Sequence, residues 1–155
     1  MRSRLTAIAA AAVLIASLTG CTFSATQSTR QAYDPSDGIG TGVGDIQVRN
    51  ALLISGDGTA ATLSVNIINS GVQNVALQVS WKTEAGRTSE NVYVRAGSTL
   101  SLGTSTNPLT LSGIDAAPGS LFPVFFQYGE VPGSEINVPV LDGSLAEYAD
   151  LVPAA

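Results

Sequence analysis

The stretch VALQVSWK, residues 75–82, decides the fold of this chain of 155 residues. Val75, Leu77, Val79 and Trp81 alternate with small or polar residues, so one face of the segment is apolar and the other is polar. A repeat of two residues is the side-chain period of a β-strand and does not fit a helix. We therefore predict a half-buried strand here, with Trp81 as a core residue and not a recognition residue.

The same period recurs in other segments, and Gly, Pro and Asn turn signals separate them. Further strands are predicted at residues 46–54, 62–67, 92–95, 100–102, 121–128 and 136–140, with a weaker candidate at 109–111 and an irregularity near 49–51. Pro123 and Pro139 fall inside predicted strands, which should therefore be edges or bulged, because proline cannot donate to a ladder. Residues 144–151 carry at most a short terminal turn of helix. About seven short strands at such spacing predict an all-β, two-sheet sandwich.

The first residues have the layout of an export signal. Two arginines, Arg2 and Arg4, precede an apolar stretch of 14 residues from Leu5 to Leu18. That length suits a signal sequence, whereas a membrane-spanning helix needs about 20 apolar residues. Cys21, the only cysteine of the chain, follows directly after small residues. An ordinary secretory signal or an uncut anchor would leave Cys21 as a free thiol in an oxidising compartment.

The run Leu18-Thr19-Gly20-Cys21 resembles the lipobox of bacterial lipoproteins, of the form Leu-small-Gly/Ala-Cys, and matches it at every position. The resemblance implies cleavage between Gly20 and Cys21 and attachment of a diacylglycerol to the Cys21 sulfur. Whether the freed amine is acylated too stays open. Two or three acyl chains would anchor the protein stably on the extracytoplasmic face of a cell membrane.

These signals divide the chain into three parts. Residues 1–20 are expected to be a lipoprotein signal peptide, residues 21–44 the lipidated Cys21 and a flexible linker, and residues 45–155 the β-sandwich domain. The linker is rich in Ser, Thr, Gln and Gly, as flexible tethers are. Its alternating glycines, Gly38 to Gly44, are not a phosphate-binding loop, because they precede a strand and open no helix.

Charge and ligand atoms exclude several kinds of chemistry. Without residues 1–20 the chain keeps five basic and twelve acidic residues, a net charge of −7, which argues against binding nucleic acid. The chain has no histidine and its one methionine is Met1. Catalysis by a histidine base is therefore excluded, and the domain lacks the side chains that bind soft metals. We therefore assign no catalytic residue, no cofactor and no metal site.

Carboxylates are the remaining candidates for chemistry. The acidic segments 34–38 and 56–58 do not match the spacing of a calcium loop and are interpreted as turns. Four glutamates, expected in or beside turns, would be the candidates for a hydrolase that uses carboxylates alone: Glu84, Glu90, Glu130 and Glu135. An exposed aromatic surface could include Tyr33, Tyr93, Tyr128 and the pair Phe125-Phe126. If Phe126 faces inward, Phe125 faces outward or packs under the terminal segment.

Read whole, the chain resembles small actinobacterial cell-envelope lipoproteins, in the order lipobox, tether and β-sandwich. The matching segments are residues 31–38, 44–51 and 63–71. It is also distantly similar to periplasmic copper chaperones, which implies an Ig-like or cupredoxin-like sandwich. Those proteins bind copper through Met and His, which this domain lacks, so the fold analogy does not carry the copper function.

Three functions follow from these observations, in order of preference. The first is a lipid-anchored extracytoplasmic interaction or accessory domain without catalysis, acting on an unknown envelope protein partner. The second is a binding module that presents a small ligand or a hard cation to a membrane partner. The third is the carboxylate-only hydrolase.

Overall fold

The structure, a computed structural model, describes Arg4 and residues 36–154. The second of two compact units, Asp34–Ala155, holds every described strand. The signal, the cleavage position and Cys21 lie outside the described residues. Within these residues, no helix has the length and apolar character needed to cross a membrane.

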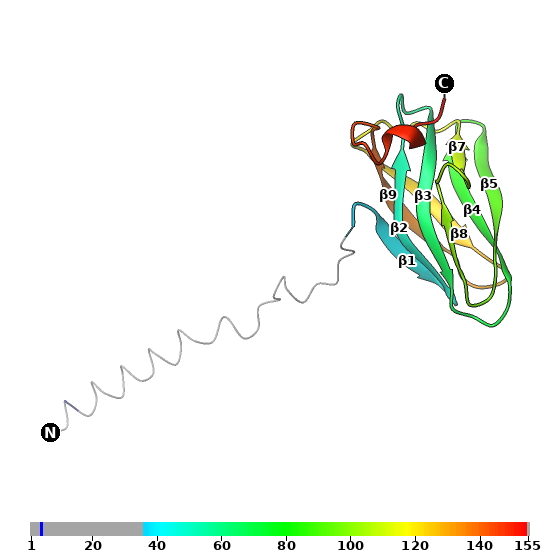
Figure 1. The fold of residues 1–155 in the computed structure, drawn as a ribbon. Helices are drawn as coiled ribbons and strands as arrows, with labels where there is room; N and C mark the ends of the chain where they lie inside the picture. Colours follow the sequence, from blue (N-terminus) through cyan, green and yellow to red (C-terminus); the bar gives the residue numbers. More distant parts are fainter. Residues whose placement is uncertain (1–3, 5–35, 155) are drawn as a thin grey trace. The chain divides into compact units, whose positions relative to one another are not determined.

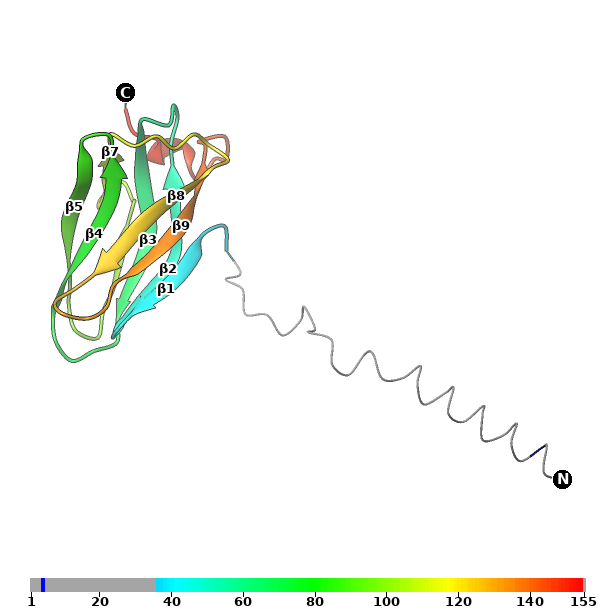
Figure 2. The same ribbon diagram turned by 180° about the vertical axis from the view of Figure 1, so that it is seen from behind.

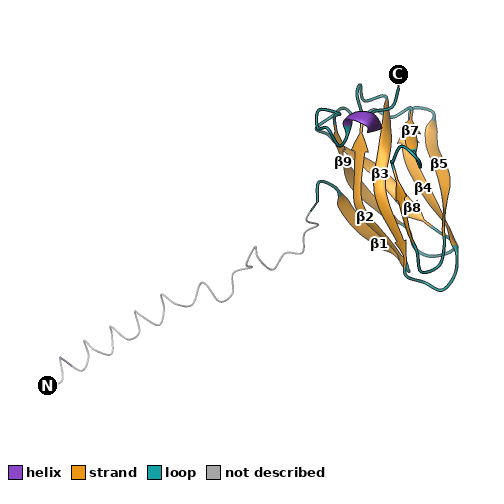
Figure 3. Ribbon diagram, viewed as in Figure 1, coloured by secondary structure: helices purple, strands orange, loops and turns teal. Residues whose placement is uncertain are grey.

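Nine strands and one short 3-10 helix make up the described domain (Figure 3). They are β1 (Ile39–Val43), β2 (Ile46–Ile54), β3 (Ala60–Asn69), β4 (Val75–Thr83), β5 (Gly86–Val94), β6 (Thr99–Leu102), β7 (Thr110–Ser112), β8 (Leu121–Gln127), β9 (Ser134–Leu141) and the helix η2 (Ala149–Leu151).

The strands form two layers that curl into one another. In Figure 1, β1, β2 and β3 lie toward the viewer, and Figure 2 shows β4, β8 and β9 on the opposite side. The strand order is β5-β4-β8-β9-β2-β3-β6, with β1 added on β2 and β7 on β3. The layers join where β9 runs parallel to the end of β2, at Leu53↔Val140 and Ile54↔Leu141. The predicted all-β sandwich is confirmed.

Alternating apolar residues from both layers fill the core. The predicted strand at residues 75–82 is β4, and its residues Val75, Leu77, Val79 and Trp81 are all buried. Trp81 is 4% exposed, so its assignment to the core is confirmed. Phe126 on β8 faces inward, is fully buried and packs in the same cluster.

A bulge in β2 confirms the irregularity expected near residues 49–51. The pairing of β2 with β3 shifts between Arg49 and Leu52, and Asn50 has a φ of 51°. The Gly38 amide donates a hydrogen bond to Asn50 Oδ1 at 2.9 Å. A Cβ on Gly38 would lie 2.6 Å from the carbonyl carbon of Asn50, so only glycine allows this approach.

The folded domain starts earlier than the sequence indicated. We expected a flexible linker up to residue 44, but β1 occupies Ile39–Val43 and pairs antiparallel with β2. Val43 is buried, and Thr41 Oγ1 lies 2.8 Å from Ser134 Oγ on β9. Glycines at every second position hid this strand, since glycine is depleted in strands and favoured in linkers.

The two prolines also correct an expectation, because neither β8 nor β9 is an edge strand. Pro123 pairs with Asn137 of β9, and the ladder from β8 to β4 ends one residue later, at Val124. Pro139 pairs with Leu121, and the pairing of β9 with β2 begins at Val140. Each missing donor therefore falls where the ladder on one side stops.

Candidate binding cleft

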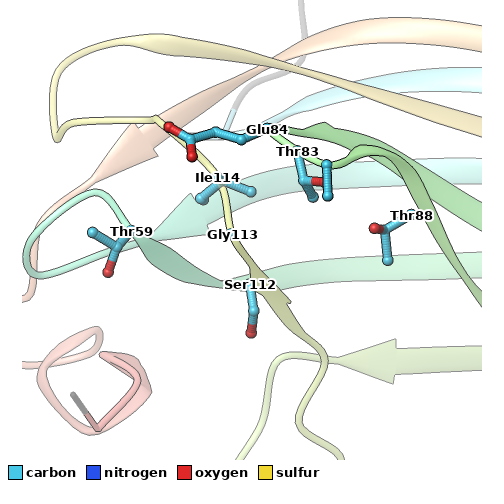
Figure 4. Close-up of a pocket in the computed structure, with 8 residues that line it drawn as sticks. Thr59, Thr83, Glu84, Thr88, Ser112, Gly113 and Ile114 are labelled. Atoms are coloured by element: carbon cyan, nitrogen blue, oxygen red, sulfur yellow. The ribbon is translucent and has the colours of Figure 1, made fainter.

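A hollow lies between the tip of the β4–β5 hairpin and the end of β7. It has a volume of about 640 Å³ and is lined by Thr59, Thr83, Glu84, Ala85, Thr88, Ser112, Gly113 and Ile114. Figure 4 shows that these side chains come from three segments: the turn before β3, the β4–β5 hairpin, and β7 with the loop after it. We call this hollow the tip cleft.

Two hydrogen bonds fix the walls of the tip cleft. Trp81 Nε1 donates to the carbonyl oxygen of Ser112 at 3.2 Å and so ties β4 of one layer to β7 of the other. Thr83 Oγ1 donates to the Gly86 carbonyl at 3.0 Å across the two-residue turn of the hairpin. The core tryptophan therefore sets the position of the cleft without lining it.

A smaller hollow of about 290 Å³ adjoins the tip cleft and shares Thr83, Glu84 and Gly113 with it. Its remaining lining residues are Lys82, Asp115, Phe122 and Pro123. Together, the two hollows bring one ammonium group and two carboxylates close to apolar side chains. This combination suits recognition of a polar ligand by hydrogen bonds and charge.

The lining groups do not make a catalytic arrangement among the described residues. Thr59, Thr83, Thr88 and Ser112 bring hydroxyl groups to the tip cleft, and no hydrogen bond joins Glu84 to any of them. The Thr59 hydroxyl donates instead to Asp57 Oδ1 at 2.8 Å. A nucleophile needs a base within hydrogen-bonding reach, and the described lining residues form no such pair.

Asp57 belongs to a turn, as interpreted from the sequence. Its Oδ1 accepts hydrogen bonds from the Thr59 amide at 2.9 Å and from the Thr59 hydroxyl. These two bonds stabilise the charged carboxylate and lower the pKa of Asp57. Within the described part of the chain, no three His, Cys, Asp or Glu side chains gather as metal ligands would.

The four glutamates named from the sequence are not brought together. Glu84 lies in the hairpin turn, as expected, whereas Glu90 lies in the middle of β5. Glu135 is paired with Phe125 in the β8–β9 ladder, and its Oε2 lies 3.6 Å from Arg87 Nη2. The expectation that all four lie in or beside turns is wrong for Glu90, because β5 extends much further than the predicted 92–95.

The aromatic candidates are dispersed as well. Phe125 lies on the outer face of its sheet, with the Arg87 guanidinium 5.2 Å from its ring centroid, and not under the terminal segment. Tyr93 is 60% exposed on β5. The Tyr128 hydroxyl accepts a hydrogen bond from the Asp45 amide at 3.1 Å. Tyr33, Gly20 and Cys21 lie outside the described residues.

Sequence reasoning missed the residues that build the far wall of the cleft. Ser112 ends a strand of only three residues, Thr110–Ser112, and Gly113 and Ile114 follow it. A strand this short gives almost no alternation to detect. The one available signal was Gly113, whose φ of 68° favours glycine.

Comparisons with known proteins give a likeness of fold. No family model and no curated protein sequence matches the chain. Among solved structures, the chain is similar to the copper-bound PCuAC domain from PmoF2, with a TM-score of 0.50 and 16% sequence identity. The match covers 66% of this chain and 97% of that domain. It supports the sandwich and the distant similarity to copper-chaperone folds.

The donor atoms of this chain do not fit copper. It has no histidine, its one cysteine is Cys21 and its one methionine is Met1, so the sandwich contributes no imidazole, thiolate or thioether. Carboxylates and backbone carbonyls suit hard cations better than Cu(I). The likeness to a copper-bound domain therefore concerns the fold and not the ligand.

Proposed function

We propose that this protein is a lipid-anchored, non-catalytic interaction domain on the extracytoplasmic face of a cell membrane. The observation that carries the proposal is the run Leu18-Thr19-Gly20-Cys21 placed ahead of a folded sandwich. The chain between Cys21 and Ser36 would hold the sandwich near the membrane within reach of an envelope protein. The dispersed glutamates and the absence of histidine support a role without catalysis.

The anchor is tested by Cys21→Ser in cells that express the full chain. We expect loss of processing and of membrane retention, because the lipid is attached to the cysteine sulfur. Fractionation and mass spectrometry of the product decide the question. A variant that is cleaved and retained like the unaltered protein would contradict the anchor.

The interaction role is tested by photo-crosslinking in intact membranes. A photoreactive residue is placed singly at exposed apolar positions: Val72, Tyr93, Leu121 and Leu145. We expect at least one discrete protein adduct whose yield falls with the Cys21→Ser anchor variant. If none of the four positions gives a crosslinked protein adduct, the interaction role is overturned.

A second candidate function, a binding module for a small ligand or hard cation, is favoured by the tip cleft. Hydroxyl groups and the Glu84 carboxylate line this volume of about 640 Å³. NMR titration with Ca²⁺, and separately with maltose as a neutral polyol, tests it on the amides of residues 83–88 and 112–115. Saturable shifts, weakened by Glu84→Gln in the Ca²⁺ arm, would support this function.

A further inference from the structure

β5 forms a long free edge of the sandwich. It stands at one end of the strand order and pairs, within the described chain, with β4 alone. The pairing is continuous from Val75↔Val94 to Thr83↔Gly86, without a bulge. Figure 2 shows β5 at the outer side of its layer. A straight edge of nine residues is a ready template for another strand.

The register fixes which backbone groups face outward. Thr83 and Gly86 flank a two-residue turn and therefore form a hydrogen-bonded pair. Pairs then alternate, so the amide and carbonyl groups that point away from β4 belong to Arg87, Ser89, Asn91 and Tyr93. These residues present their N–H and C=O groups to the open side of the sandwich.

The core-facing side of β5 changes character halfway along the strand. Val94 and Val92 are buried, but the next positions on the same face are Glu90, opposite Val79, and Thr88, opposite Trp81. Glu90 and Thr88 are exposed although their partners on β4 are buried. The sandwich is thus open beside the first half of β5.

Two hollows lie along this free edge. The tip cleft includes Thr88, and a second hollow of about 300 Å³ runs from Glu90 to Tyr93 on β5 and across to β6 and the loop at residues 107–109. Side chains of an added strand would find space in both. Nine residues of strand span about 30 Å, enough to reach from one hollow to the other.

The charged side chains that line these two hollows are acidic. Glu84 lines the tip cleft and Glu90 lines the second hollow, and neither lining set contains Lys or Arg. Arg87, the basic residue of β5, is held on the outer face by Glu135 and by the Phe125 ring. The two hollows therefore favour a partner segment that places basic side chains in them.

We propose that the free edge of β5 binds an extended, Lys- or Arg-bearing segment of a partner protein as an added β-strand. Main-chain hydrogen bonds to Arg87, Ser89, Asn91 and Tyr93 hold the segment, and Glu84 and Glu90 select its basic side chains. A second copy of this chain fits less well, since its own β5 would bring another Glu90 to the same edge. This inference rests on the proposed interaction function and names its partner surface.

The test uses the full chain from Cys21 in detergent, with a blocked nine-residue peptide of alternating Lys and Val as the probe. Two control peptides are an N-methylated version, which cannot pair along its backbone, and a version with Glu in place of Lys. NMR follows hydrogen exchange of the four edge amides. We expect the probe to slow their exchange at least tenfold and both controls to leave it unchanged.

Substitutions in β5 give a second measurement. Asn91→Pro removes an outward-facing N–H without breaking the ladder with β4, as proline is tolerated on the open side of an edge strand. It should weaken probe binding at least tenfold, while Asn91→Ala, which keeps the N–H, should not. Glu90→Gln should weaken it at least threefold, and the matched surface change Glu147→Gln should not. A thermal melt of each variant checks folding.

The outcomes separate the two proposals. Unprotected edge amides, equal binding of the Glu peptide, or undiminished binding by Asn91→Pro would overturn the strand addition. Protection of the same amides that rises with protein concentration alone would also overturn it, in favour of a second copy. Anchor-dependent adducts from other surfaces would leave the interaction function standing in each of these cases.

Discussion

The Tyr148 hydroxyl donates a hydrogen bond to Asp37 Oδ2 at 2.7 Å. The bond joins the C-terminal segment, just before η2, to the chain just before β1. A negative carboxylate beside the phenol stabilises its protonated form, and the hydrogen bond to Asp37 raises the pKa of Tyr148 to about 12.

The Tyr148 phenol should ionise well above pH 10. Its folded pKa is raised from 10.0, so the contact is fully present below about pH 10 and is lost as the pH rises toward about 12. Phenolate absorbance should show a late step that Tyr148→Phe removes and Asp37→Asn moves toward 10.0. A late step that persists in Tyr148→Phe would contradict the assignment.

Trp81→Ala should lower the free energy of unfolding by about 3–5 kcal/mol, as large aromatic truncations in cores do. The ring is buried, and its Nε1 bonds the Ser112 carbonyl. Trp81→Phe keeps most of the volume and loses the bond, so it should cost less. Chemical denaturation measures both, and a loss under about 1 kcal/mol for Trp81→Ala would show that the ring is not a core group.

β1 should add to the stability of the folded domain. A fragment of residues 36–155 should melt cooperatively with a chelator present, since it contains no cysteine and its described residues form no cluster of metal ligands. A fragment that starts at residue 45 loses buried Val43 and should be at least about 2 kcal/mol less stable. Equal stability of the two fragments would show that β1 adds nothing to the fold.

Asn50 should tolerate few replacements. Asn50→Ala places an alanine at a φ of 51° and removes the acceptor for the Gly38 amide, at a cost of about 1–3 kcal/mol. Asn50→Gly relieves the backbone and should cost about 1 kcal/mol, while Asn50→Asp keeps the acceptor. Urea unfolding should rank the aspartate variant as the most stable, the glycine variant next and the alanine variant last. An alanine variant as stable as the aspartate variant would contradict this ranking.

The sandwich should not bind copper specifically. Its donor atoms are carboxylate and backbone oxygens, which hold Cu(I) weakly. Titration of Cu(I) against a chelator of micromolar affinity, with Cu(II) in parallel, checks this. Stoichiometric copper uptake from the chelator would show a site that the ligand argument overlooks.

A strand could be predicted from the sequence where it buries one apolar face in the core. The strand at residues 75–82 was predictable because one of its faces is apolar throughout. The first half of β5 was not, because its core-facing positions are Glu90 and Thr88, and an open edge leaves no hydrophobic pattern. β1 was not predicted because Gly40 and Gly42 give this segment the composition of a flexible linker.

The tip cleft was beyond sequence reasoning for a different reason. Its walls meet because Trp81 of β4 bonds the backbone of Ser112 on β7, a contact 31 residues apart in the chain. Any residue has a backbone carbonyl, so residue type at position 112 carries no signal for this contact. Glu84 could be named as a candidate from the sequence, but the residues that line the tip cleft with it could not.

The hairpin of β1 and β2 has a mechanical consequence. Tension transmitted through the chain before Ser36 enters the sandwich just before β1, where Asp37 is bonded to Tyr148 and Gly38 to Asn50. Because β1 pairs with β2 alone among the described strands, the pull would open its pairs one after another, from Ile39↔Ala51 toward Val43↔Ile46. The remaining strands would keep their pairing while β1 yields, so β1 would act as a force-limiting element between an anchor and the domain.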